Sequence, residues 1–464
     1  MRYGIVSNKF MVSQMRLDGN FHLSEGLNVR KQIRKSPYKI LTIDDFTKDV
    51  YCPGIFKRNY VNKGTPFLGG GDIQKSYSNC GKYLLEKTTP NYSSLLVEKG
   101  CTLVTCGGTI GDAVFANGIL SRCLASQHVL RVIPDGIKEG MLFAYLASSY
   151  GKLLLTTNTY GSVIPTLNSN YVKKVPIPDF PEDFQQNIDS LVKKAAEQRE
   201  EASDLLQEAQ MLLKQYANLP EISYDDYDFN GAPIQSRSAS TFIRSRKDVT
   251  SMSFHAINYS ERIRQLENKI KVSTQPLSEV IEDGKFFNTG SFPRVEVAKE
   301  HGIMLINQSD IFDRIIKGKY ISKRGVKTDN LVEYGEVMIA GVGTLGEGET
   351  FCRAIFANED LKGQLVSGEF IRMKTNGTVP AGYLYAWLSS DYGFRLIRST
   401  HTGTKLCRPI QKLLLQKPVP IIDQKYMDEI DEKVRIAHTL WYEANINEKQ
   451  AIQMVEEEIE KWNN

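Results

Sequence analysis

The chain has 464 residues, of which 41% are hydrophobic and 24% are charged, and its formal net charge is +4. This length can form at least two hydrophobic cores, and the composition is that of an ordinary globular protein. No apolar run approaches the roughly 20 residues of a membrane span, and the first residues lack a secretory pattern, so we expect no membrane association and a cytoplasmic location. The seven cysteines include no Cys-x-x-Cys pair and have no nearby histidine, which argues against a disulfide framework or a zinc site.

The net charge is distributed unevenly along the chain. Residues 1–181 carry +10 and residues 223–422 carry +5, whereas residues 182–222 carry −5 and residues 423–464 carry −6. Basic segments therefore alternate with acidic ones. This segregation indicates that the basic segments face a polyanion and that the acidic ones do not.

The chain contains an ordered internal repeat. Segment 100–111, which includes several glycines, returns as segment 335–346, displaced by 235 positions. Asp72-Ile73 returns as Asp310-Ile311, displaced by 238, and Pro176-Ile177-Pro178 returns as Pro418-Val419-Pro420, displaced by 242. A displacement that drifts by a few residues is typical of loop insertions in a duplicated unit. The sequence therefore predicts two similar domains rather than a solenoid.

Each of these domains combines two kinds of pattern. Short β-branched runs, such as 102–105 and 129–133, are typical of strands, whereas the amphipathic stretches 140–155 and 382–397 are typical of helices. Turns that contain Gly or Pro separate them. The predicted fold class is α/β (α+β), with two similar mixed domains related by an internal pseudo-twofold.

A long helix is predicted after each domain, because apolar residues recur there at alternating spacings of three and four. In the first helix nine of ten such positions are apolar: Ile188, Leu191, Ala195, Gln198, Ala202, Leu205, Ala209, Leu212, Tyr216 and Leu219. In the second, nine of eleven are apolar: Met427, Ile430, Val434, Ala437, Trp441, Ala444, Glu448, Ala451, Val455, Glu458 and Trp462. A single amphipathic helix of this length is unstable alone in water. We therefore expect the two helices to form an antiparallel coiled coil; the alternative is that each packs on its own domain.

The chain is thus expected to have five parts. They are a first domain at 1–181, a central coiled-coil helix at 182–222, a linker at 223–248, a second domain at 249–422 and a distal coiled-coil helix at 423–464.

The sequence contains no recognisable catalytic motif. It has no Asn-Pro-Pro-Tyr motif of an adenine methyltransferase, no phosphate-binding G-x-x-x-x-G-K-[ST] loop, no H-E-x-x-H and no G-x-S-x-G. Pro134-Asp135 and Pro178-Asp179 lack the Asp/Glu-x-Lys that a restriction-type nuclease places downstream. We therefore expect no catalytic residue, no metal site and no cofactor.

Polar, basic and glycine-rich clusters in both domains are candidates for binding DNA. Arginine suits guanine, Asn and Gln amides suit adenine, and a glycine lets the backbone approach a nucleic acid closely. The candidates are Lys57, Arg58, Asn59, Gln74, Lys75, Gly108, Thr109, Gln127, His128, Thr159, Tyr160, Ser162, Lys317, Lys319, Lys323, Arg324, Thr344, Arg398, His401, Thr402, Thr404, Lys405 and Arg408. A structural turn at 107–111, and ordinary solvated loops elsewhere, are the alternative interpretations.

Several motifs together resemble the specificity subunit of type I restriction–modification systems. They are Phe67-Leu68-Gly69-Gly70-Gly71-Asp72-Ile73, Gly108-Thr109-Ile110-Gly111, Gln127, Gly161-Ser162-Val163-Ile164-Pro165-Thr166-Leu167 and Pro176-Ile177-Pro178. The resemblance extends over essentially the whole chain and is clearer in the first half. The second copy departs from the pattern at residues 403–409, where the family prefers a G-S-x-x-P spacing.

The resemblance implies a non-catalytic DNA-recognition subunit. Its two target-recognition domains would each read one half of a split, asymmetric sequence in double-stranded DNA. The helix pair would set the spacer and dock two methyltransferase (modification) subunits, and restriction motor-nuclease subunits would join through the complex. Three alternatives are the recognition subunit of a fused methyltransferase–nuclease system, a coiled-coil scaffold without a nucleic-acid role, and a hydrolase with an unrecognised site.

Overall fold

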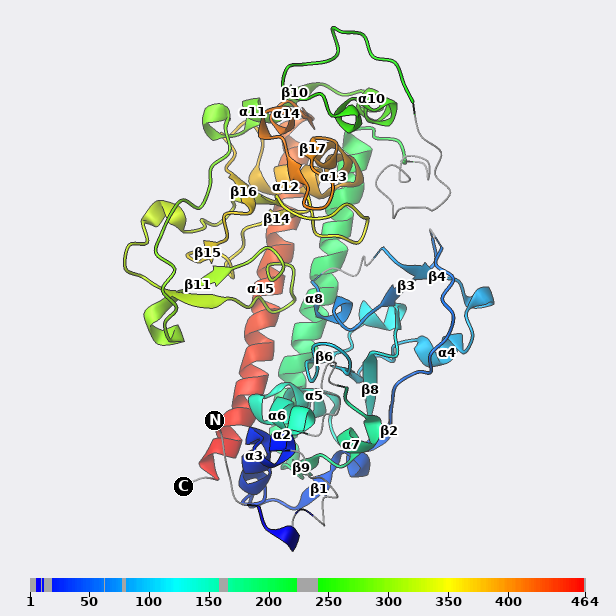
Figure 1. Cartoon of the computed structure of the whole chain (residues 1–464), viewed down its shortest axis with the longest axis vertical. Coiled ribbons are helices and arrows are strands. Elements are labelled where there is room, and N and C mark those ends of the chain that lie inside the picture. Colours follow the sequence, from blue (N-terminus) through cyan, green and yellow to red (C-terminus); the bar gives the residue numbers. More distant parts are fainter. Residues whose placement is uncertain are drawn as a thin grey trace. The chain divides into compact units, whose positions relative to one another are not determined.

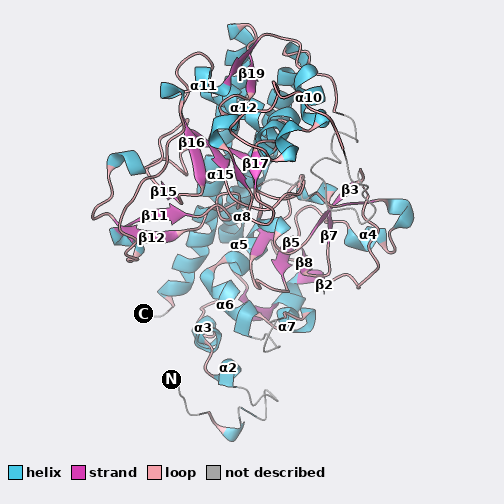
Figure 2. Ribbon diagram, turned by 45° about the horizontal axis from the view of Figure 1, so that its top comes forward, coloured by secondary structure: helices cyan, strands magenta, loops and turns pink. Residues whose placement is uncertain are grey.

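The computed structural model describes residues 6–9, 11, 19–61, 63–76, 81–157, 166–222 and 241–462 (Figure 1). The chain forms two compact units. Unit 1 comprises Met1–Glu200 and Glu443–Asn464, and unit 2 comprises Glu201–Tyr442. Each unit mixes helices and strands (Figure 2).

Unit 1 is built on two small sheets. The larger one is antiparallel, with the strand order β2 (Thr47–Tyr51), β8 (Val129–Pro134), β5 (Thr102–Thr105) and β6 (Ala113–Phe115). The smaller one has the order β4 (Tyr83–Leu84), β3 (Thr65–Leu68) and β7 (Leu124–Ala125), and a separate antiparallel pair joins β1 (Ile40–Thr42) to β9 (Pro176–Pro178). All four residues of β5 are buried, because the strand lies in the middle of its sheet and is covered on both faces.

Short helices cover the sheets of unit 1. They are α2 (Gly19–His22), α3 (Glu25–Ile33), α4 (Tyr92–Leu95), α5 (Glu139–Ala147), α6 (Ser149–Thr157) and α7 (Ser169–Lys173). Seven of the nine residues of α5 are buried, as expected of a helix that is apolar on every side.

Unit 2 repeats this construction. One antiparallel sheet has the order β14 (Ala354–Phe356), β13 (Val337–Ala340) and β16 (Phe370–Met373), and a second has the order β12 (Lys319–Ser322), β11 (Gly302–Ile306) and β15 (Leu365–Val366). Two strand pairs are β10 (Thr274–Pro276) with β19 (Pro418–Pro420) and β17 (His401–Thr402) with β18 (Arg408–Pro409). The short helices are α10 (Glu261–Asn268), α11 (Leu277–Val280), α12 (Ala381–Ser389), α13 (Asp391–Arg398) and α14 (Gln411–Leu414).

A buried arginine marks the repeat at the level of single residues. Arg131 on β8 lies opposite Leu103 and its guanidinium lies 5.8 Å from the Tyr51 ring; Arg372 on β16 lies opposite Met338 and 4.8 Å from the Phe287 ring. The two arginines differ in their partners. Arg372 forms an ion pair of 2.8 Å with Glu336, whereas Arg131 donates to backbone carbonyls, including those of Leu95 and Ala125. The scaffold is therefore duplicated while individual contacts have diverged.

The prediction of one helix at 140–155 and one at 382–397 is wrong in one detail, because each stretch forms two helices. Ser148 and Ser390 have extended backbones at the break. Their hydroxyls accept hydrogen bonds of 3.0 Å from the N–H groups of Gly151 and Gly393. A Cβ at either glycine would lie about 2 Å from a carbonyl oxygen of the preceding helix. The chain turns there because a serine caps the new helix and glycine permits the close approach.

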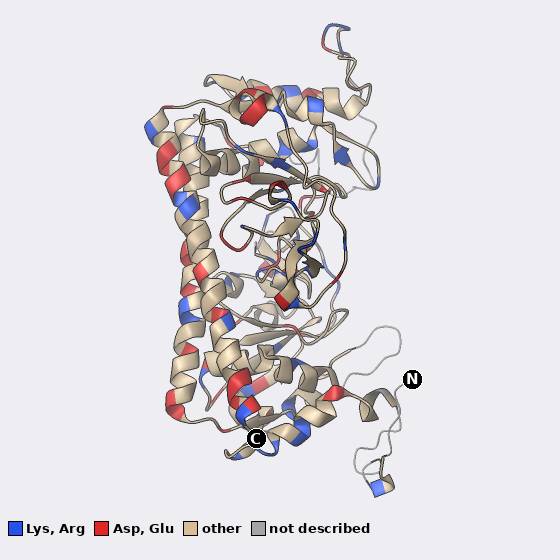
Figure 3. Ribbon diagram, turned by 90° about the vertical axis from the view of Figure 1, so that its left-hand side faces the viewer, with Lys and Arg blue, Asp and Glu red and all other residues tan. Residues whose placement is uncertain are grey.

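The long helices are α8 (Glu182–Tyr216) and α15 (Gln424–Lys461), and they run antiparallel (Figure 1). In unit 2 Lys433 forms an ion pair of 2.9 Å with Glu208, and Tyr426 stacks on Tyr216 with ring centroids 3.7 Å apart. In unit 1 Arg199 pairs with Glu448 at 2.6 Å. Residue numbers on α15 fall as those on α8 rise, so the antiparallel pair is confirmed, and with it the predicted fold class. Acidic residues recur along both helices (Figure 3).

The helices also pack on the globular part of each unit. Ile188 and Val192 belong to the core of unit 1, and Leu213 and Ala217 to the core of unit 2. The heptad pattern missed Leu213, which is fully buried, and chose Leu212, which is half-buried. The helices therefore pair with each other and also pack on globular residues. The alternative, that each helix packs on its own domain, holds for α8 only in its first part, because its last turns belong to the core of unit 2.

Among the residues that the structure describes, no helix is long and apolar enough to cross a membrane. The same residues contain no group of three or more His, Cys, Asp or Glu placed to hold a metal ion.

Candidate nucleic-acid interface

Three of the candidate residues in unit 1 form a connected chain of side chains. Arg58 Nη2 donates to Gln127 Oε1 at 2.6 Å, and Gln127 Nε2 lies 3.2 Å from His128 Nε2. The Arg58 guanidinium also lies 5.1 Å from the Phe67 ring. Arg58 comes from the loop after β2, and Gln127 and His128 from the loop between β7 and β8. The fold thus brings together two clusters that are almost 70 residues apart in the sequence.

The glycine turn after β5 adjoins this chain. A Cβ at Gly107 would lie 2.6 Å from His128 Nδ1, and Gly108 and Gly111 have φ angles of +83° and +80°. Glycine is thus required at these positions for structural reasons, as the alternative interpretation held. Gly108 and Thr109 are nevertheless exposed beside His128.

Further candidates of unit 1 lie on the loops beside these linked side chains. Lys57 and Asn59 are exposed on the loop that carries Arg58, whereas Gln74 and Lys75 are half-buried at the end of a short turn at 69–74. The Asp72 carboxylate accepts the Gly69 N–H at 2.8 Å and so holds this turn. Three other candidates lie outside the described residues: Thr159, Tyr160 and Ser162.

In unit 2 the candidates gather on the β17–β18 hairpin. Thr402, Thr404, Lys405 and Arg408 are all exposed, and Gly403 starts the loop with a φ of +93°. Gly343 and Cys407 exchange two backbone hydrogen bonds, of 3.2 and 2.7 Å. These bonds hold the loop that carries the exposed Thr344 next to the hairpin.

Arg398 and His401 are corrections to the candidate set. Both are buried, with side-chain exposures of 0% and 3%. Arg398 donates to the carbonyl oxygens of Gly346 and Phe351, at 2.7 and 2.9 Å, and burial lowers its pKa to about 10. His401 Nδ1 donates to the Arg398 carbonyl at 2.6 Å, and burial lowers its pKa. These two residues hold the backbone of the adjoining segments through hydrogen bonds and are too buried to contact a ligand.

Four basic candidates lie on β12 and beside it. Lys317, Lys319, Lys323 and Arg324 are exposed. Lys319 forms an ion pair with Glu296, which offsets part of its attraction for a phosphate. This group belongs to the β12–β11–β15 sheet and is separate in sequence from the hairpin.

The sequence interpretation missed two apolar residues among the polar candidates. Leu406 on the hairpin is 67% exposed and Leu345, next to Thr344, is 36% exposed. The sequence did contain a signal for Leu406: it lies in a short loop with glycine, threonine and lysine, where a leucine is not expected to be a core residue.

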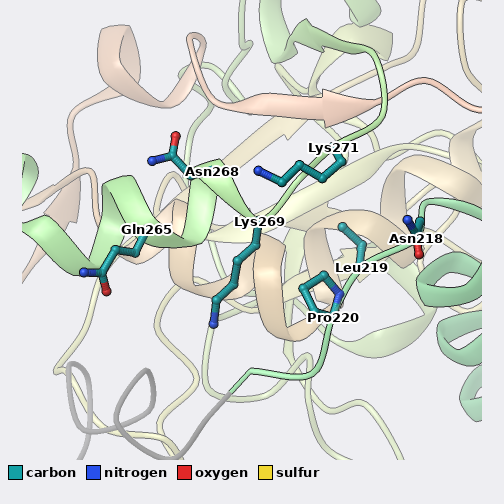
Figure 4. Close-up of a pocket in the computed structure, with 7 residues that line it drawn as sticks. All are labelled: Asn218, Leu219, Pro220, Gln265, Asn268, Lys269 and Lys271. Atoms are coloured by element: carbon teal, nitrogen blue, oxygen red, sulfur yellow. The ribbon is translucent and has the colours of Figure 1, made fainter.

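A cavity of about 600 Å³ in unit 2 lies at the C-terminal ends of α8 and α10 (Figure 4). Its lining includes Asn218, Gln265, Lys269 and Lys271, and the polar ends of these side chains point in different directions (Figure 4). Basic residues at helix C-termini are favoured by the helix dipole. The lysines are explained by that position, and the cavity is not a candidate site.

The fold and the exposed residues define a class: two similar mixed domains that present different polar loops and are each joined to one of two paired helices. Residues 36–199 match the family model of the type I restriction modification DNA specificity domain. The resemblance to the specificity subunit of type I restriction–modification systems is confirmed.

The solved structures matched by this chain include two specificity subunits. That from M. genitalium has 13% sequence identity and a TM-score of 0.34, covering 92% of this chain and 96% of that chain. The HsdS subunit from Thermoanaerobacter tengcongensis has 11% identity and a TM-score of 0.28, with coverages of 92% and 96%. The search of curated proteins found no match.

Proposed function

We propose that the chain is the DNA sequence-recognition subunit of a type I restriction–modification system in the cytoplasm. Each unit reads one half of a bipartite, asymmetric site in double-stranded DNA. The helix pair docks two methyltransferase subunits and, through them, restriction subunits. The chain itself catalyses nothing, and its partners supply the cofactors and the chemistry.

One observation carries this proposal: the two units share a scaffold but expose different side chains on it. Unit 1 presents the half-buried Arg58 and Gln127 linked to the exposed His128, whereas unit 2 presents the exposed Lys405 and Leu406 on a hairpin. Side chains of different chemistry recognise different base edges in the major groove. Two such readers in one chain therefore favour a target with two dissimilar halves.

The exposed apolar residues of the long helices support the docking of partners. Met211 and Ile436 in unit 2 are 62% and 43% exposed, and Ile446 in unit 1 is 45% exposed. Leucine-sized side chains on an otherwise acidic helix gain free energy when a partner covers them.

The experiment is methylome mapping of a host that carries this chain together with its methyltransferase subunit. We expect methylated adenines in a split motif with two unlike halves and a non-specific spacer of constant length. A continuous motif, or a palindromic one, would contradict the proposal.

DNA binding by the reconstituted complex separates this function from a coiled-coil scaffold. Contacts with phosphates make the logarithm of the binding constant fall linearly with the logarithm of the salt concentration. We expect such a fall for DNA that contains the motif, measured by fluorescence anisotropy. Retention of protein partners without any retention of DNA would favour the scaffold.

A further inference from the structure

The β17–β18 hairpin of unit 2 projects a loop whose residues up to Leu406 lie outside the core. His401 pairs with Pro409 and Thr402 with Arg408, and the loop 403–407 connects them. Residues 402–406 are all exposed, whereas Cys407 is fully buried and closes the loop. A two-stranded ribbon of this kind fits the width of the major groove of B-DNA.

Leu406 lies in the exposed part of this loop without a structural reason. Its side chain is 67% exposed, so it contributes little to the core. It is not needed for the turn either, because Gly403 supplies the positive φ of +93°. The neighbouring loop adds Leu345, which is 36% exposed and lies two residues from Gly343, the backbone partner of Cys407.

The surroundings of Leu406 suit a base edge. Thr404 and Lys405 precede it and Arg408 follows, all exposed. Hydroxyl groups and cations contact phosphates and base edges, whereas an aliphatic side chain among them can contact only an apolar group. In the major groove that group is the C5-methyl of thymine.

The base of the hairpin is held in place before any ligand arrives. Asn258 Nδ2 donates to the carbonyl oxygens of Ser399 and His401, at 2.6 and 3.0 Å. Arg398 fixes the adjoining loop through the Gly346 and Phe351 carbonyls. A loop that is ordered in advance loses less conformational entropy on binding.

We propose that Leu406 recognises a thymine in the half-site read by unit 2, through contact of its side chain with the C5-methyl group. This inference rests on the proposed function and names the base chemistry that one reader accepts. Leu406 is then a specificity-determining residue, and Lys405 and Arg408 hold the hairpin on the DNA.

The test removes the methyl group alone. In the complex with its methyltransferase subunits, the protein is given motif duplexes in which deoxyuridine replaces one thymidine of one half-site at a time. At one position in the half-site of unit 2 we expect about 3- to 10-fold weaker binding, as the loss of one buried methyl contact implies. Deoxyuridine in the half-site read by unit 1 should not change the affinity through this hairpin.

The variant Leu406→Ala removes the other partner of the same contact. It should bind the thymidine duplex about 3- to 10-fold more weakly and should no longer distinguish thymidine from deoxyuridine at that position. Val295→Ala is the matched control, since Val295 is an exposed apolar residue of unit 2 outside the hairpin. It should bind both duplexes like the unaltered chain. A thermal melt of each variant checks that it is folded.

Three results would overturn the inference: a half-site without an A·T pair, equal binding of every deoxyuridine duplex, or persistent discrimination in Leu406→Ala. If the complex neither binds nor methylates a split motif, the proposed function itself fails. If it does both and the deoxyuridine duplexes bind equally, the function stands and only the role of Leu406 falls.

Discussion

Three buried arginines show how the surroundings of a charge set its role. Arg131, Arg372 and Arg398 all donate to backbone carbonyls, and only Arg372 also pairs with a buried carboxylate. A guanidinium has five donors in a fixed fork and can hold several chain segments at once. These arginines therefore fix the loops and strands that present the exposed residues.

His438 gives a prediction for the pH dependence of stability. Its ring packs against Phe356 and Tyr385, with centroids 4.9 and 5.3 Å away, and burial lowers its pKa from 6.5 to about 4. Between these values the unfolded chain binds the proton more readily than the folded one. The stability that this group contributes is full above pH 6.5 and is lost as the pH falls towards 4.

We expect this histidine to lower the free energy of unfolding by on the order of 1–2 kcal/mol between pH 7 and pH 5. Urea denaturation at the two pH values measures the difference. His438→Phe should show a smaller decrease than the unaltered chain, because its ring cannot be protonated. An equal decrease in both would contradict the assignment.

A polar layer interrupts the helix seam in unit 1. Two of the three polar positions of the heptad pattern, Gln198 and Glu448, lie in it: Gln198 Nε2 donates to Glu443 at 2.7 Å, and Arg199 pairs with Glu448. Arg199 also donates to Asn445 Oδ1 at 2.9 Å. Buried polar layers of this kind fix the register of paired helices at a cost in stability.

Arg199→Met should therefore be strongly destabilising, by about 3–5 kcal/mol, because Glu448 stays buried without its arginine. Replacing both residues, as Arg199→Met with Glu448→Leu, should restore much of that loss. Urea denaturation of the single and double variants at pH 7 measures both effects. A double variant as unstable as the single one would contradict this explanation, and Glu201→Gln, at an exposed position of α8, is the control.

At the scale of the whole molecule, the duplicated scaffold predicts modular recognition. Exchanging residues 1–181 for the corresponding domain of another specificity subunit should change one half of the DNA target and leave the other half as it was. The physical reason is that each unit has its own core and its own exposed loops. Methylome mapping of the exchanged chain gives the new motif, and a change in both halves would refute independent reading.

Periodic and repeated features could be predicted from the sequence. The heptad spacing indicated both long helices and their antiparallel pairing, and the repeat indicated two mixed domains. These predictions succeed because the spacing of apolar residues along a chain reports which face of an element is buried.

Single side chains at the candidate site could be predicted only in part. Arg398 and Lys405 look alike in sequence, each a cation near a glycine. The first is buried under a loop and the second is exposed on a hairpin, because α13 is packed into the core while residues 402–406 leave it.

The sequence by itself determined that the chain has two mixed domains and two long helices, since these depend on repeats and on the spacing of apolar residues along the chain. Only the tertiary structure decided the break between α5 and α6, the link between Arg58 and Gln127, and the burial of Arg398 and His401. Each of these depends on which distant segments meet, and contacts between distant segments leave no periodic trace in the sequence.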